Sequence, residues 1–156
     1  MTYKEFVSYF QADLFIPSLD AENKNSALER MVAHLIENNR IKRGDVVLEA
    51  LKKRESLGST GVGKSIAIPH GRTTVTGALT VVYARSVSGI PWDASDKKPA
   101  HFVFLILAPH QERANHYLPL LGRIVEFVRD AAVRRKLLKV DTHAGLLKVL
   151  EEAKAK

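Results

Sequence analysis

The sequence predicts an α/β fold, a single three-layer domain in which helices cover both faces of a mixed β-sheet. Segments with the apolar spacing of helices alternate along the chain with short runs of β-branched residues, as in layered α/β domains. Residues 101–108, HFVFLILA, form an unbroken apolar run, which is typical of a central strand covered on both faces. The 156 residues are 46% hydrophobic and show no internal repeat or linker, so one domain over residues 1–156 is expected.

The first half of the chain predicts two helices. Asn23 or a neighbour can cap a helix that runs to about Asn39. A second helix is expected from Asp45, as its N-cap, to Leu57, because the residues between them are mostly good helix formers. Gly58 then ends this helix. The buried faces are expected to consist of Leu28, Met31, Val32 and Leu35 in the first helix and Val47, Ala50, Leu51 and Leu57 in the second.

Strands are expected where β-branched and apolar residues gather between turn signals. Residues 66–68 predict a short strand that ends at Pro69, and residues 79–87 predict a second strand. A turn-rich stretch, 89–99, leads into the central strand. The remaining expected elements are an early strand over 14–19 and three helices over 116–129, 131–139 and 142–153.

The composition excludes several classes of protein. The chain has no cysteine, so disulfides, thiol catalysis and cysteine-ligated zinc are excluded. No apolar run is long enough to span a bilayer and no signal peptide opens the sequence, so an intracellular protein without membrane insertion is expected. The formal net charge of +7 would suit nucleic acid, but the basic residues are scattered and no recognition helix or RNA-binding signature accompanies them. Nucleic acid is therefore not an expected partner.

Residues 58–65, GSTGVGKS, fit every position of the nucleotide-binding P-loop pattern. A P-loop needs a buried strand before it and a helix that begins at the Gly-Lys-Ser. Here the order is reversed, because a helix is expected before the glycines and a strand after them. A P-loop nucleotide-binding protein that uses Gly58–Ser65 stays an alternative, but the context favours a loop that leads into the strand before His70.

His70 is the first candidate for chemistry. It lies at the end of the short predicted strand, between Pro69, which fixes the approach, and Gly71, which leaves the exit uncrowded. The imidazole is therefore expected at a surface rather than in the core. A neutral imidazole nitrogen is nucleophilic near pH 7, so His70 can accept a phosphoryl group. The alternative is a loop histidine without a role.

Arg54 lies in the last turn of the second helix, among its apolar residues and beside the glycine loop. A charge there needs a partner, or must reach past the helix end to solvent or to a site. An arginine near His70 would stabilise phosphoryl oxygens by hydrogen bonds of about 1.5–3 kcal/mol each. Ser59, Thr60 and Gly61 supply hydroxyls and accessible amides, so their loop can bind an anion, although an ordinary turn would have the same composition.

His116 is a further candidate, because it lies near the start of a predicted helix and just past the central strand. Helix N-termini favour anions, and ligands of α/β sheets usually bind beyond the carboxyl ends of strands. His110, in the same connection, has less support. No His-Glu spacing indicates a metal site, so neither a metal nor a cofactor is expected.

Residues 55–71 resemble the phosphohistidine signature of bacterial phosphotransferase-system (PTS) IIA domains of the fructose/mannitol and nitrogen-regulatory type. The positions that match are Glu55, Val62, Gly63, Ile66, Ala67, Ile68, Pro69, His70 and Gly71. Residues 54–63 resemble the lead-in of the nitrogen-regulatory branch, and the similarity extends through 91–94 and 116–118 to nearly the whole chain. Ser65 departs from the family, whose similar members have glycine before this strand.

The resemblance implies a cytoplasmic phosphocarrier, a phosphotransferase that works through a phosphohistidine. His70 would accept the phosphoryl group from a histidine-containing phosphocarrier protein, His116 would be the second active-site histidine, and Arg54 would stabilise the phosphate. Two roles stay open. A regulatory component, favoured by the nitrogen-type lead-in, would act on protein targets according to its phosphorylation state. A sugar-transport component would donate to a IIB domain.

Overall fold

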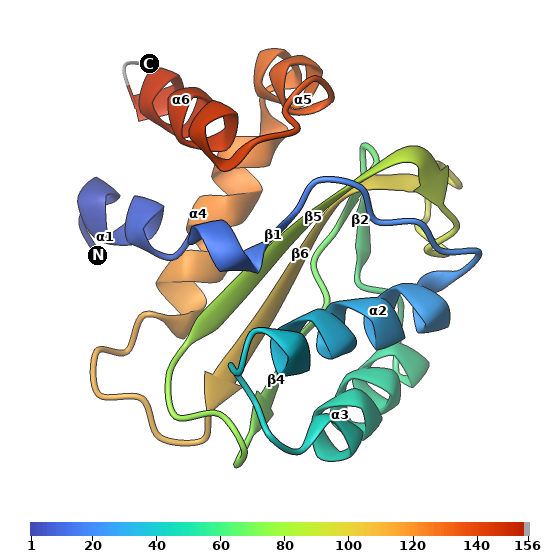
Figure 1. Ribbon diagram of the computed structural model, residues 1–156. Coiled ribbons are helices and arrows are strands. Elements are labelled where there is room, and N and C mark those ends of the chain that lie inside the picture. Colours follow the sequence, from blue (N-terminus) through green and yellow to red (C-terminus); the bar gives the residue numbers. More distant parts are fainter. Residues whose placement is uncertain (155–156) are drawn as a thin grey trace.

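The computed structural model describes residues 1–154 and places one six-stranded sheet between two layers of helices (Figure 1). The sheet order is β1-β5-β6-β3-β2, and β4 also pairs with β6. The long strands β5 and β6 are antiparallel, whereas β3 and β4 run parallel to β6, so the sheet is mixed as predicted. The strands are β1 (Phe15–Ile16), β2 (Gly61–Gly63), β3 (Ile66–Ala67), β4 (His70–Thr73), β5 (Thr80–Ile90) and β6 (Ala100–Pro109).

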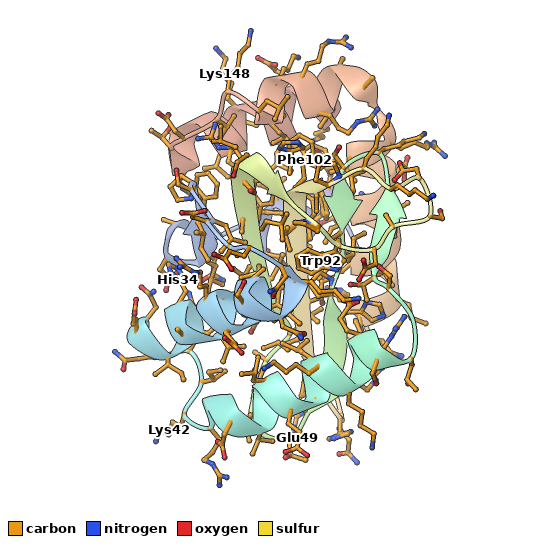
Figure 2. The ribbon with its side chains drawn as sticks, turned by 90° about the vertical axis from the view of Figure 1, so that its right-hand side faces the viewer. His34, Lys42, Glu49, Trp92, Phe102 and Lys148 are labelled. Carbon is orange, nitrogen blue, oxygen red and sulfur yellow. The ribbon has the colours of Figure 1, made fainter. Side chains whose placement is uncertain are left out.

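The helices divide between the two faces of the sheet. Helices α2 (Lys24–Glu37) and α3 (Gly44–Ser56) cover one face, and α1 (Tyr3–Ser8), α4 (Tyr117–Arg129), α5 (Ala131–Leu137) and α6 (His143–Lys154) lie on the other (Figure 1). Figure 2 shows Glu49 on α3 and Lys148 on α6 at opposite ends of the molecule, with the sheet between them. The predicted three-layer α/β class is therefore confirmed.

The central strand β6 shows why both faces need a cover. Phe102, Phe104 and Ile106 belong to the apolar core under α1 and α4–α6, whereas Val103 and Leu105 belong to the core under α2 and α3. Because successive side chains of a strand point to opposite faces, an unbroken apolar run contributes to the hydrophobic core on each side of the sheet. The prediction of a doubly covered strand at 101–108 is confirmed, with one more residue at each end.

The α2–α3 pair follows the predicted pattern except at the start of α3. Asn23 caps α2 and exchanges hydrogen bonds with Ser26 in a capping box. Helix α3 begins at Gly44, so the prediction of Asp45 as its N-cap is wrong. A Cβ at Gly44 would lie 2.3 Å from Cδ1 of Ile36, so glycine permits the helices to approach closely there.

Two other local expectations differ from the structure, and one short helix was not expected. Leu57, expected on the buried face of α3, is 79% exposed because the helix ends at Ser56. The early strand predicted over 14–19 is reduced to the two residues of β1, preceded by a 3₁₀ turn, Ala12–Leu14. Helix α1 was not predicted, since six residues are too few for a clear apolar period, although Thr2 and Glu5 form a capping box at its start.

The alternative of a P-loop at Gly58–Ser65 is wrong. Strands β2 and β3 form an antiparallel hairpin across this segment, and Lys64 and Ser65 make its two-residue turn. Both residues have positive φ, 56° and 65°, which is the conformation that twisted hairpin turns require. No helix begins at Lys64, so the helix amides that would hold a nucleotide phosphate are absent from this segment.

Replacing Ser65 by glycine is expected to stabilise the protein by about 0.5–1 kcal/mol, because glycine adopts positive φ without steric cost. The free energy of unfolding in urea measures the effect. Ser95→Gly is the matched control, since Ser95 is exposed and is not among the residues with positive φ. The control is expected to lose stability through the greater freedom of the unfolded chain. A loss of stability in Ser65→Gly would contradict the strain at this turn.

Candidate functional site

His70 occupies a break in the strand beside β6. Strands β3 and β4 pair with β6 in one continuous register, but Ile68 and Pro69 interrupt the ladder between them. The prediction that the strand ends just before His70 is therefore half correct, because the strand resumes at His70. The half-buried imidazole folds back, and its Nδ1 lies 2.7 Å from the carbonyl oxygen of Ile68.

This contact assigns the tautomer of His70. A carbonyl oxygen can only accept a hydrogen bond, so Nδ1 must carry the proton. In the neutral ring the lone pair then lies on Nε2. Nε2 of His70 is thus the ring nitrogen whose lone pair is free in the neutral form.

Tyr117 lies beside His70, and Arg72 lies over Tyr117. The Tyr117 ring meets the His70 ring edge to face, with 6.4 Å between their centroids. The Arg72 guanidinium lies 4.7 Å from the centre of the Tyr117 ring and donates to the carbonyl of Pro109 at 3.1 Å. Burial raises the pKa of the Tyr117 hydroxyl, while the charges of Arg72 and Arg54 lower it by less. Both arginines therefore place positive charge near the ring that contacts His70.

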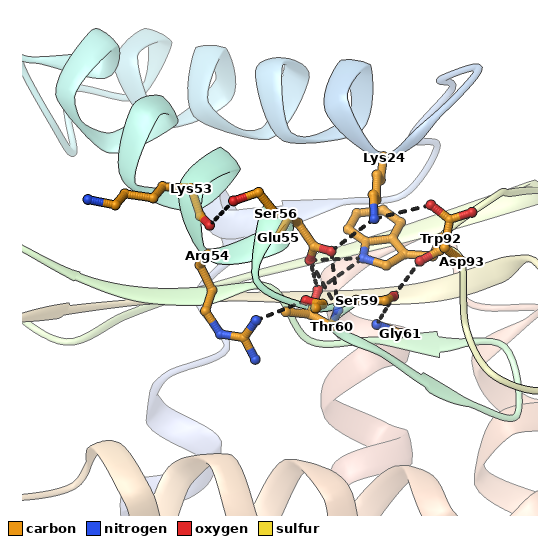
Figure 3. Close-up of polar contacts among 11 residues, drawn as sticks. Lys24, Lys53, Arg54, Glu55, Ser56, Ser59, Thr60, Gly61, Trp92 and Asp93 are labelled. Carbon is orange, nitrogen blue, oxygen red and sulfur yellow. Dashed lines mark hydrogen bonds and ion pairs between the residues drawn. The ribbon is translucent and has the colours of Figure 1, made fainter.

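Arg54 extends from the last turn of α3 toward the glycine loop (Figure 3). Its Nη1 donates to the carbonyl of Gly58 at 2.9 Å. Within residues 1–154 its remaining guanidinium nitrogens make no hydrogen bond, so they keep donors for a ligand. This agrees with the expectation that Arg54 reaches past the helix end.

His116 is the N-cap residue of α4, but its ring contacts α1 and the segment after it. Its Nδ1 lies 2.8 Å from the Tyr9 hydroxyl, and its Nε2 lies 3.9 Å from a Glu5 carboxylate oxygen. The carboxylate of Glu112 accepts from the backbone N–H of His116 and of Tyr117. Across the described part of the chain no hydrogen bond joins His116 to His70, and Tyr117 is the α4 residue that contacts His70.

The predicted donors of the phosphate-binding loop bind within the protein (Figure 3). The Ser59 hydroxyl donates to the carbonyl of Trp92 and accepts from the Gly61 N–H at 3.0 Å. The Thr60 hydroxyl and N–H both donate to the Glu55 carboxylate. A phosphate contact by Ser59, Thr60 or Gly61 would therefore require an exchange of these hydrogen bonds, and their direct role stays a prediction.

Sequence reasoning missed several residues around the site. Arg72 had a signal, since residues two apart on a strand point to the same face and Arg72 follows His70 by two. For Tyr117 the sequence offers no signal other than its position next to His116. The histidines without a predicted role bind backbone carbonyls: His34 that of Asp13, His101 that of Ser86 and His143 that of Phe10.

Residues 1–154 contain neither a candidate metal site nor a candidate membrane span. No group of three or more His, Asp or Glu side chains in this range could hold a metal ion. No helix in the same range is both long and apolar enough to cross a membrane.

The matching family model describes phosphotransferase-system IIA proteins, and similar proteins include a IIA component and a nitrogen regulatory protein. The family described as "Phosphoenolpyruvate-dependent sugar phosphotransferase system, EIIA 2" matches residues 8–153. The chain is 36% identical over 129 residues to the PTS system fructose-specific EIIA component of Haloferax volcanii, covering 83% of each chain. It is 35% identical over 129 residues to a nitrogen regulatory protein of Bradyrhizobium diazoefficiens, covering 80% of each.

Solved structures share the fold. The nitrogen regulatory protein IIA-Ntr from Neisseria meningitidis matches with a TM-score of 0.82 at 24% identity, covering 94% of this chain and 99% of that one. The IIA mannitol enzyme from Escherichia coli, solved in complex with phosphorylated IIB mannitol enzyme, matches with a TM-score of 0.75 at 21% identity, covering 91% and 96%.

Proposed function

Because the chain belongs to the EIIA type 2 family of the phosphoenolpyruvate-dependent sugar phosphotransferase system, we propose that it carries a phosphoryl group on Nε2 of His70. The observation that supports this most directly is the Nδ1 contact with the Ile68 carbonyl. This contact leaves the Nε2 lone pair free for attack on phosphorus. The Tyr117 ring beside His70 lies under the Arg72 guanidinium, and the charge of Arg54 also opposes the rise in the pKa of Tyr117 that burial causes.

The transfer is an in-line displacement between two histidines. The bond from phosphorus to the donor nitrogen breaks, and the donor ring keeps that electron pair, while the Nε2 lone pair of His70 forms the new bond. The His70 ring then has substituents on both nitrogens and a positive charge, which the Ile68 carbonyl stabilises by accepting from Nδ1–H. Arg54 and Arg72 stabilise the negative phosphoryl oxygens during transfer.

The proposed partners rest on membership of this family. A histidine-containing phosphocarrier protein is the proposed donor, and residues 1–156 are proposed to form one IIA domain with a cytoplasmic location. The mannitol IIA enzyme was solved with its phosphorylated IIB partner, which supports a IIB domain as acceptor. His116 is proposed to act as the second histidine of the site, after its ring leaves the Tyr9 contact.

Two uses of the phosphoryl group stay open, since relatives of both kinds match at 36% and 35% identity. In the regulatory use, preferred from the lead-in over 54–63, the phosphorylation state controls binding to protein targets. In the transport use, the phosphoryl group passes to a IIB domain and on to a sugar. Loss of the label on addition of a fructose-type or mannitol-type IIB domain would favour transport.

The proposal is tested by incubating the protein with phosphoenolpyruvate, the general phosphotransferase enzyme and the histidine phosphocarrier. We expect an acid-labile, base-stable phosphate on the tryptic peptide 65–72, SIAIPHGR, in which His70 is the sole histidine. Coupling between ³¹P and ¹⁵N in histidine-labelled protein is expected to identify Nε2 as the attached atom. Phosphate on another peptide would contradict His70, and phosphate on Nδ1 would contradict the tautomer.

A further inference from the structure

Glu55 is a buried acid next to the proposed site. It is the residue after Arg54 in the last turn of α3, and it is only 5% exposed. Its carboxylate accepts from the N–H and hydroxyl of Thr60 and from the indole N–H of Trp92, at 3.3 Å for the indole (Figure 3). A carboxylate in such a place is costly unless it is paired and hydrogen-bonded, and an apolar residue of similar size would fill the space at less cost.

Lys24 supplies the countercharge from the start of α2. Its Nζ lies 3.4 Å from a Glu55 oxygen and 3.1 Å from a carboxylate oxygen of the exposed Asp93. Burial lowers the pKa of Lys24, but the hydrogen bond to Asp93 and the attraction of Glu55 raise it more. Glu55 thus sits in a fully paired network that joins α2, α3, the glycine loop and the turn after β5 (Figure 3).

The network continues by backbone hydrogen bonds to the ring of His70. Glu55 fixes Thr60, and the Thr60 carbonyl accepts from the N–H of Ile68 at 3.0 Å. The Ile68 carbonyl in turn accepts from Nδ1 of His70 at 2.7 Å. Two residues, Thr60 and Ile68, therefore connect the Glu55 carboxylate to the imidazole.

The same loop also holds Arg54. The Gly58 carbonyl that accepts from Arg54 lies two residues before Thr60. The loop that Glu55 holds through Thr60 therefore carries both the acceptor of the Arg54 guanidinium and the acceptor of the Ile68 N–H.

We propose that Glu55 is a positioning residue for phosphoryl transfer: through Thr60 and Ile68 it holds His70 in the Nδ1–H tautomer, with Nε2 presented to the donor. This role rests on the proposed function of His70. It differs from a role in stability alone, because it sets the ring geometry and the proton position of a residue that Glu55 does not touch.

Glu55→Gln tests the role, because the amide keeps the shape but turns an NH₂ group or a single oxygen toward the donors of Thr60. We expect the maximal rate of phosphoryl transfer to His70 to fall by about 10- to 100-fold, with the KM for the phosphorylated carrier unchanged. The ¹⁵N shifts of His70 are expected to move from the Nδ1–H tautomer toward a mixture. Glu49→Gln, an exposed position on the same helix, is the matched control and is expected to match the wild type.

Thr60 gives a second, independent pair. Thr60→Val removes the hydroxyl that donates to Glu55 and is expected to show the same slow transfer and mixed tautomer. Thr60→Ser keeps the hydroxyl and is expected to restore the Nδ1–H tautomer and most of the rate. If Glu55→Gln does not fold, the rate and the tautomer of the two Thr60 variants test the positioning role instead.

The outcomes separate the positioning role from the proposed function. A wild-type protein that takes no phosphate on His70 would refute the function, while the tautomer measurement, which needs no phosphate, would still test the chain from Glu55 to His70. If Glu55→Gln and Thr60→Val melt at a lower temperature but keep the wild-type rate and tautomer, Glu55 is structural only and the inference is overturned.

Discussion

His70→Ala is expected to reduce acid-labile labelling of the protein by a factor on the order of 10³ or more, because the variant has no nucleophile to form the covalent bond. The fold is expected to persist. The ring is half-buried and makes one hydrogen bond, to Ile68, so its loss costs about 1 kcal/mol of stability. Labelling from the phosphorylated carrier measures the transfer, and thermal melting followed by circular dichroism checks the fold.

His110→Ala is the matched control for that experiment. His110 is exposed in the connection between β6 and α4, and it is a histidine that the sequence also made a candidate. Its variant is expected to be labelled like the wild type. Labelling of His70→Ala at the wild-type rate would show that another residue is the acceptor.

Trp92→Ala is expected to cost about 3–5 kcal/mol of the free energy of unfolding, a large share of the 5–15 kcal/mol typical of a domain. The indole is 1% exposed, in the core under α2 and α3, so its removal leaves a cavity. Its Nε1 also donates to Glu55 at 3.3 Å and to the Thr60 hydroxyl oxygen at 3.0 Å. Urea denaturation measures the loss.

Two controls separate the parts of this effect. Trp92→Phe keeps much of the ring volume but removes the N–H donor, so it is expected to lose less, about 1–3 kcal/mol. Val87→Ala, at a side chain that is 66% exposed, is expected to stay within about 0.5 kcal/mol of the wild type. A loss below about 1 kcal/mol in Trp92→Ala would contradict the close packing around the indole.

The layers of the fold were predictable because their signals are local. An unbroken apolar run marks β6, and helical spacing with a capping asparagine marks α2. Strand β2 gave no such signal, because two of its three residues are glycines and strand propensity disfavours them. Its pairing depends on the turn at Lys64 and Ser65, whose positive φ the residue types do not suggest.

The candidate site was predictable only where a residue's own surroundings in the sequence were unusual. Arg54 stood out as a charge on an apolar helix face, and His70 stood out between proline and glycine. Glu55 looks like a surface residue at a helix end, and its burial depends on Trp92, far along the chain. The surroundings of His116 depend on α1, the helix that the sequence pattern did not reveal.

The shortness of β2 has a consequence for the protonation of His70. The last backbone hydrogen bond of the hairpin runs from the Ile68 N–H to the Thr60 carbonyl, so the sheet edge has no further strand from the Ile68 carbonyl onward, and β4 pairs with β6 alone. Open edges usually invite another strand, because their carbonyls and N–H groups lack partners. Here the imidazole itself takes the vacant acceptor of Ile68. If β2 were long enough to continue the ladder, one of its N–H groups would compete for the Ile68 carbonyl. The imidazole of His70 would then lose the contact that favours its Nδ1–H tautomer.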